Sequence, residues 1–85
     1  MNETDRSEIK STIIQIMASV LNIDTDTITE DLELETDLRI DSLALYEIVV
    51  DIEEKYSLRI SNDEADDLKT VGEAIDFIVD KISHS

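Results

Sequence analysis

Apolar residues recur at helical spacing along most of this sequence, and this periodicity restricts the chain to a small helical fold. At about 100° per residue, the apolar side chains of residues 2–21 fall on one side of a helix and the polar ones on the other. The apolar stripe consists of Ile9, Ile13, Ile16, Met17 and Val20, flanked by Ile14 and Leu21. The first segment is therefore predicted to be a long amphipathic helix.

The same spacing predicts a second helix over residues 42–56, with core-facing residues Leu45, Ile48, Val49, Ile52 and Tyr56. Capping boxes mark two further helix starts, because Ser or Thr followed three residues later by Glu satisfies the first free amides of a helix. Ser61 and Glu64 open a short third helix. Thr70 and Glu73 open a last helix that ends near Ile82.

The expected fold is all-α: a small four-helix bundle of three long helices and one short one, forming a single domain over residues 1–85. The last helix turns its apolar residues inward, and residues 83–85 form a frayed tail. The inward residues are Ala74, Ile75, Ile78, Val79 and Ile82.

A long first loop is predicted between residues 22 and 41, where the helical period is lost. Its apolar residues are expected to pin it to the core, since long structureless loops are uncommon in compact domains. These residues are Ile23, Ile28, Leu32, Leu34, Leu38 and Ile40. The loop also contains eight carboxylates beside a single Arg39. Such crowding is expected to raise carboxylate pKa values and to make moderate acidification stabilising.

This acidic loop raises a calcium-binding hypothesis. Asp24, Asp26, Glu30 and Glu35 occupy positions 1, 3, 7 and 12 of a twelve-residue loop. However, the sixth position is not the glycine that an EF-hand requires. We therefore expect no defined metal site, and only weak, diffuse binding of divalent cations.

Composition excludes several classes of protein. The chain has no cysteine and one histidine, so thiolate chemistry is impossible and a Ser-His catalytic pair is not expected. With 22 acidic and 7 basic residues, the formal net charge of −15 repels nucleic acid and favours basic partners. No apolar run is long enough to span a membrane, and the N-terminus is acidic. A non-enzymatic, monomeric, cytoplasmic protein is expected.

Ser42 is the first candidate functional residue. Asp41 is a good N-cap, and eight of the ten residues after Ser42 are apolar, so Ser42 should lie exposed at the start of a helix. Unpaired amides and the positive end of the helix dipole favour a phosphate at that position. The local sequence therefore suits a phosphodiester on the Ser42 oxygen.

Asp41-Ser42-Leu43, opening an acidic helix in a short acidic chain, resembles the prosthetic-group site of the acyl carrier protein family. The resemblance implies that a phosphopantetheinyl transferase attaches 4'-phosphopantetheine from coenzyme A to Ser42, with Asp41 beside the hydroxyl. The thiol of this arm would carry acyl groups as thioesters between enzymes of fatty acid, polyketide or related biosynthesis. It also implies that the helical core opens to shelter the acyl chain.

The outer face of the second helix is the expected partner-binding surface. Glu47, Asp51 and Glu54 lie there with two exposed aliphatic residues, Leu43 and Val50. The resemblance implies that basic patches of acyl-transferring and ketosynthase-type enzymes dock on this face. Rim charges chiefly raise association rates, so binding should be fast, weak and sensitive to salt.

Three residues around Ser42 depart from the pattern of many fatty-acid carriers. Arg39-Ile40 stand where Gly-Ala is common, and Ala44 where an acidic residue is frequent. The arginine is expected to place a positive charge beside the prosthetic group, and the isoleucine to stiffen the turn. The cargo, the pathway and the partner enzymes stay open, whether housekeeping or specialised. The alternative functions are an unmodified acidic interaction module and a calcium-responsive regulator.

Overall fold

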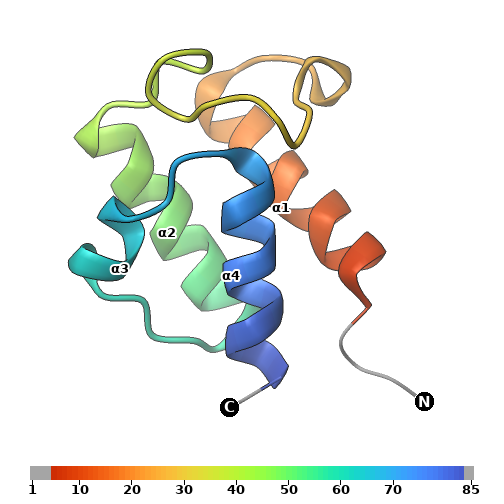
Figure 1. Cartoon of the computed structure of the whole chain (residues 1–85), viewed down its shortest axis with the longest axis vertical. Coiled ribbons are helices and arrows are strands. Elements are labelled where there is room, and N and C mark those ends of the chain that lie inside the picture. Colours follow the sequence, from red (N-terminus) through yellow and green to blue (C-terminus); the bar gives the residue numbers. More distant parts are fainter. Residues whose placement is uncertain (1–4, 84–85) are drawn as a thin grey trace.

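A computed structural model describes residues 5–83 and has the predicted all-α architecture (Figure 1). Three long helices, α1 (Arg6–Leu21), α2 (Ser42–Tyr56) and α4 (Val71–Ser83), are accompanied by the short α3 (Asn62–Asp66). A single 3-10 turn, η1 (Thr25–Thr27), interrupts the first loop. The bounds of α2 match the prediction, and α4 ends one residue later than expected.

The start of α1 differs from the prediction. Asp5 has an extended backbone and its side chain accepts a hydrogen bond from the Ser7 amide at 3.0 Å, so Asp5 is the N-cap and the helix begins at Arg6. Residues 2–4 of the expected helix lie outside the described residues. The periodic pattern did not identify the Asp5 cap, because the spacing of apolar residues contains no information about capping. At the other end, Asn22 closes the helix in the left-handed conformation.

The core is built almost entirely from aliphatic side chains. Helix α1 packs against both α2 and α4, and the most deeply buried large side chains come from all three: Ile13, Ile48, Val71, Ile75 and Ile78. Burying one such side chain contributes about 1.5–3 kcal/mol. Ala18 is also buried, whereas Ile16 and Val20 of the predicted stripe are only half-buried. The face of α1 that meets the core is therefore rotated slightly from the predicted one.

The first loop is packed against one end of the bundle, as expected (Figure 1). Ile28, Leu34 and Ile40 are buried in the core. Backbone hydrogen bonds also fasten the loop to the entrance of α4: Leu34 N to Lys69 O at 2.8 Å, Val71 N to Leu32 O at 3.0 Å, and Gly72 N to Glu30 O at 2.9 Å. One expected anchor was wrong, because Ile23 is 40% exposed.

The capping-box prediction is confirmed for α3 and only half correct for α4. Ser61 and Glu64 make both reciprocal hydrogen bonds. At α4, the Thr70 hydroxyl accepts from the Glu73 amide at 3.2 Å, but the Glu73 carboxylate accepts from the Lys69 amide instead of the Thr70 amide. Thr70 forms an isolated antiparallel bridge with Glu33 of the first loop. The backbone before α4 is therefore paired with the loop, unlike that of a helix whose start is not paired.

An ionic cluster joins α1, the first loop and α4. Arg6 binds Glu30 through two hydrogen bonds, of 2.6 and 3.0 Å, and Asp76 through another of 2.8 Å. Lys10 lies 3.1 Å from the same Glu30 carboxylate. These partners lower the pKa of Glu30 to about 2. The expectation of raised carboxylate pKa values was therefore wrong for this residue.

Two further carboxylates, those of Asp31 and Glu64, also have lowered pKa values. The Thr29 hydroxyl lowers the pKa of Asp31 by hydrogen bonding, and the Ser61 amide with Lys81 lowers that of Glu64. Crowding in the sequence did not become mutual repulsion in these cases, because each carboxylate found a local donor.

The Glu30 cluster should make stability depend on pH in a defined window. Because folding lowers this pKa from 4.5 to about 2, the stabilisation is complete above 4.5 and is lost as the pH falls toward 2. Urea unfolding of the wild-type chain and of Glu30→Gln should differ by a constant free energy between about pH 7 and pH 5.5, and the difference should shrink toward about pH 3.

Glu35→Gln is the matched control, since it removes the same charge from the same loop at an exposed residue that makes no ion pair among residues 5–83. A Glu30→Gln difference that stays constant down to about pH 2 would contradict the assignment.

Candidate functional site

The site begins where the first loop becomes α2. Ser42 is the first residue of the helix and is exposed. The Asp41 carboxylate accepts a hydrogen bond from the Ala44 amide at 2.8 Å, and the Asp41 carbonyl accepts from the Leu45 amide at 2.9 Å. The predicted N-cap is therefore confirmed. The amides of Ser42 and Leu43 have no partner within residues 5–83, so they remain available to an anion at the Ser42 oxygen.

The residues just before this helix start hold it in place. Ile40 is buried, with 7% of its surface exposed, and its amide donates to the Leu34 carbonyl at 2.9 Å. The chain is thus anchored two residues before Ser42. Such an anchor fixes the direction in which α2 leaves the loop while leaving the serine itself at the surface.

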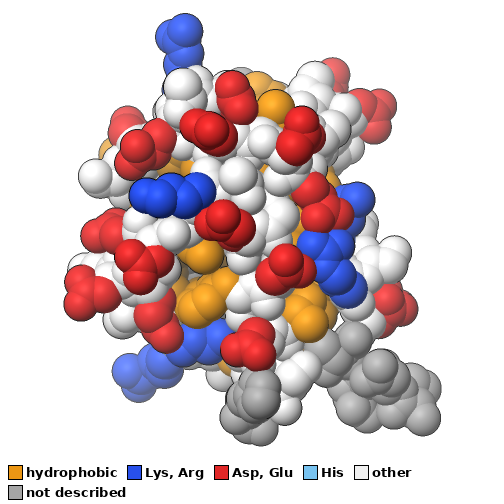
Figure 2. Space-filling model, viewed as in Figure 1, with side chains coloured by type: hydrophobic (Ala, Val, Ile, Leu, Met, Phe, Trp, Pro, Cys, Tyr) orange, Lys and Arg blue, Asp and Glu red, His pale blue; other side chains and the backbone are white. Residues whose placement is uncertain are grey.

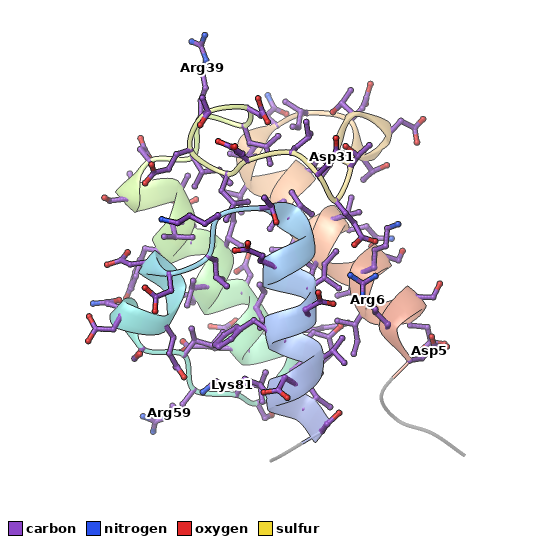
Figure 3. All side chains as sticks on the ribbon, in the orientation of Figure 1. Asp5, Arg6, Asp31, Arg39, Arg59 and Lys81 are labelled. Atoms are coloured by element: carbon purple, nitrogen blue, oxygen red, sulfur yellow. The ribbon has the colours of Figure 1, made fainter. Side chains whose placement is uncertain are left out.

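The backbone of the turn before Ser42 differs from the expectation that Ile40 stiffens it. The left-handed residue of this turn is Arg39, with φ of 57°, whereas Ile40 is simply buried. Figure 3 shows the Arg39 side chain extending away from the body of the molecule at the first-loop end. The positive charge therefore projects into solvent from a fixed backbone position near Ser42.

Two hollows that share Ser42, Leu45, Ala65 and Asp66 lie at the start of α2, one between α2 and α3 and the other also bordered by the first loop. One has a volume of about 310 Å³ and is lined by Ser42, Leu45, Tyr46, Val49, Asn62, Ala65 and Asp66. The other, of about 240 Å³, is lined by Leu34, Glu35, Ile40, Asp41, Ser42, Leu45, Ala65, Asp66 and Leu68. A group attached to Ser42 therefore has concave surface next to its attachment point.

The predicted docking residues are mostly exposed on α2. Glu47, Asp51 and Glu54 are exposed, and Leu43 is 67% exposed. Val50 was expected to be exposed as well, but it is half-buried and presents less apolar surface than Leu43. On the face of the molecule drawn in Figure 2, Asp and Glu side chains are scattered widely, with hydrophobic side chains visible between them.

Asp51 and Glu54 also line a separate hollow of about 440 Å³ between α1 and α2. The docking residues therefore do not form one flat stripe. Leu43 and Glu47 lie near the Ser42 end of α2, and Asp51 and Glu54 extend the acidic surface toward α1.

Sequence reasoning missed the α2–α3 side of the site. Tyr46 is 61% exposed and lies one helical turn after Ser42, a spacing that could have identified it. Asn62 and Asp66 of α3 complete the same hollow. No local signal indicates that α3 folds back against the start of α2, so these two residues could not have been found from the sequence pattern.

The four residues of the calcium hypothesis are not assembled around an ion. Glu30 is bound by Arg6 and Lys10 instead. Among residues 5–83, no three His, Asp or Glu side chains are grouped so that they could hold a metal ion. In the same part of the chain, no helix has both the length and the apolar character needed to cross a membrane.

Comparisons with known proteins agree with this geometry. Residues 11–78 match the family described as "Phosphopantetheine attachment site". An acyl carrier protein of Rubrobacter xylanophilus is 37% identical over 76 residues, which cover 89% of this chain and 94% of that protein. One from Lactobacillus johnsonii is 39% identical over 71 residues, covering 84% and 89% respectively.

Solved structures show the same relationship. The acyl carrier protein of Enterococcus faecalis aligns with a TM-score of 0.74 and 32% identity, covering 89% of this chain and 96% of that one. A doublet acyl carrier protein from prodigiosin biosynthesis aligns with a TM-score of 0.77 and 26% identity, covering 95% and 38%.

The fold and the matches define a phosphopantetheine-binding carrier. This chain belongs to the acyl carrier protein family. It is accordingly an acyl carrier with covalently attached 4'-phosphopantetheine, and it works with biosynthetic enzymes. The exposed start of α2, with its unpaired amides, fits a phosphate-linked group.

The Asp41 cap should be important for the stability of the site. Asp41→Ala removes the acceptor of the Ala44 amide, so it should lower the free energy of unfolding by about 1 kcal/mol. Asp41→Asn keeps an acceptor at this position and should retain most of that stability. Chemical denaturation of both variants measures the effect. Equal destabilisation by Ala and Asn would show that the cap hydrogen bond is not what Asp41 contributes.

Proposed function

We propose that Ser42 carries the 4'-phosphopantetheine arm and that the chain presents acyl thioesters on it without contributing catalytic residues. The observation that supports this most strongly is the exposed Ser42 hydroxyl at the first position of α2, beside two amides without protein partners. Those amides and the helix dipole would stabilise the negative charge of the phosphodiester. Asp41 keeps this helix start formed and places a carboxylate next to the hydroxyl as the transferase docks.

The arm would lie in the two hollows between α2 and α3. They adjoin Ser42 and combine the apolar Leu45 with the polar Asn62 and Asp66, which suits an arm containing both amides and methylene groups. The aliphatic core below is nearly closed. Its cavity of about 20 Å³ is lined only by apolar surface. This volume is about that of one water molecule, so an acyl chain enters the core only if the helices around it move apart.

Docking would use the α2 surface. Glu47, Asp51 and Glu54 supply negative charge, and Leu43 with part of Val50 supplies apolar contact. The partners are the phosphopantetheinyl transferase and acyl-transferring and ketosynthase-type enzymes with basic patches. We further propose that residues 1–85 act as one monomeric carrier domain in the cytoplasm.

The test of Ser42 is loading followed by intact-mass measurement. The chain is incubated with coenzyme A, magnesium and a promiscuous phosphopantetheinyl transferase. The wild-type chain should gain the mass of one phosphopantetheine group, and Ser42→Ala should gain none. Ser7→Ala removes another exposed hydroxyl, in the first turn of α1, and should load like the wild-type chain. Loading of Ser42→Ala, or no loading of the wild-type chain by several transferases, would contradict the proposal.

Charge reversal tests the docking surface. The double variant Glu47→Lys and Asp51→Lys should slow loading and acyl transfer about tenfold or more, because rim charges mainly set the association rate. The control reverses Glu8 and Asp26, two exposed acids outside α2, and changes the net charge equally. Circular dichroism should show helical spectra for both variants. Equal rates for the two double variants would mean that only net charge matters.

A further inference from the structure

Arg39 is held rigidly in a conformation that forces its side chain outward. The residues on both sides are tied down: the Leu38 amide donates to the Glu33 carbonyl at 3.1 Å, and the Ile40 amide donates to the Leu34 carbonyl at 2.9 Å. Leu38 packs against the core and Ile40 is buried within it. Arg39 lies between these two anchors with φ of 57°, a conformation that glycine adopts without the steric penalty of a side chain.

The guanidinium of Arg39 makes no hydrogen bond or ion pair with the described residues, 5–83. Arg6, Lys10 and Lys81 form ion pairs, whereas Arg39 forms none with any residue between 5 and 83. The nearby carboxylates do not approach it: Asp37 accepts from the Glu33 amide, and Asp41 accepts from the Ala44 amide. Although the chain carries 22 acidic residues, this cation is left available for an external acceptor.

Its position makes that acceptor part of an enzyme acting at Ser42. Arg39 stands three positions before Ser42, so their α-carbons lie at most about 10 Å apart. An enzyme whose active site reaches Ser42 therefore comes near the backbone of residue 39, and the Arg39 side chain projects from the first-loop end of the molecule (Figure 3). A uniformly basic enzyme surface would be repelled there. A carboxylate would instead receive the bidentate hydrogen bonds that a guanidinium donates.

We propose that Arg39 is a recognition residue that pairs with a carboxylate on the phosphopantetheinyl transferase that loads this chain. The transferase would then present a mixed surface, basic opposite the acidic residues of α2 and acidic opposite the loop before it. This pattern would select this carrier over carriers that lack a cation at this position, because the partner's carboxylate would be left facing acidic residues. The inference rests on Ser42 being the loaded residue.

The experiment measures kcat and KM for loading by the transferase encoded in the same genome, with the wild-type chain, Arg39→Glu and Arg39→Gln. Arg39→Glu should lower kcat/KM about tenfold or more, mainly through KM, and Arg39→Gln should fall between the two. The defect should become smaller at high salt.

The matched control is Arg59→Glu. Arg59 is exposed, its side chain has no partner within residues 5–83, and it lies at the opposite end of the molecule (Figure 3). The two substitutions change net charge equally, but Arg59→Glu should leave loading within about twofold of wild type because it lies far from the proposed contact.

The sign of the effect separates the hypotheses. If the enzyme surface near Arg39 is basic, Arg39→Glu loads as fast as wild type or faster, and the proposal is overturned. Equal slowing by Arg39→Glu and Arg59→Glu also overturns it. A wild-type chain that the transferase does not load would instead refute Ser42 as the attachment residue. Arg39→Gln decides the matter if Arg39→Glu fails to give a helical spectrum.

Discussion

The attachment of the first loop to the helical core is the constraint on which the site depends. Residues 22–41 contain little regular structure, yet Ile28, Leu34 and Ile40 are buried and three backbone hydrogen bonds join residues 30–34 to residues 69–72. These contacts fix the position at which α2 begins. Without it, Asp41 could still cap a helix, but Ser42 would have no fixed position relative to α3 and the adjoining hollows.

Acidic residues in the first loop and on α2 differ in whether they form ion pairs. At the base of the first loop, Glu30 is neutralised by Arg6 and Lys10, and the resulting cluster links α1 to the loop and α4. On α2, Glu47, Asp51 and Glu54, the residues proposed for docking, form no ion pair among residues 5–83. The bundle therefore uses a few ion pairs to join its segments, and the acidic residues proposed for docking lie outside those pairs. Arg39, the residue proposed for recognition, likewise lies outside the ion pairs among residues 5–83.

Features set by local sequence could be predicted, and features set by distant contacts could not. The bounds of α2, the Asp41 cap and the Ser61–Glu64 capping box each depend on residues within one helical turn. The pairing of Glu33 with Thr70, the neutralisation of Glu30 and the approach of α3 to Ser42 join segments far apart in sequence. The left-handed Arg39 follows from the burial of its neighbours. For this reason the sequence predicted a positive charge near Ser42 but not the direction in which the Arg39 side chain points.

The most direct test of the account is to locate the prosthetic group on the chain purified from its own host. Fragment-ion mass spectrometry assigns a phosphopantetheine group to a single residue. The account predicts that every fragment carrying this mass contains Ser42, and that fragments lacking Ser42 are unmodified. The group on another hydroxyl residue, or a chain that is never modified in its host, would contradict the central claim that the start of α2 is built to carry the arm.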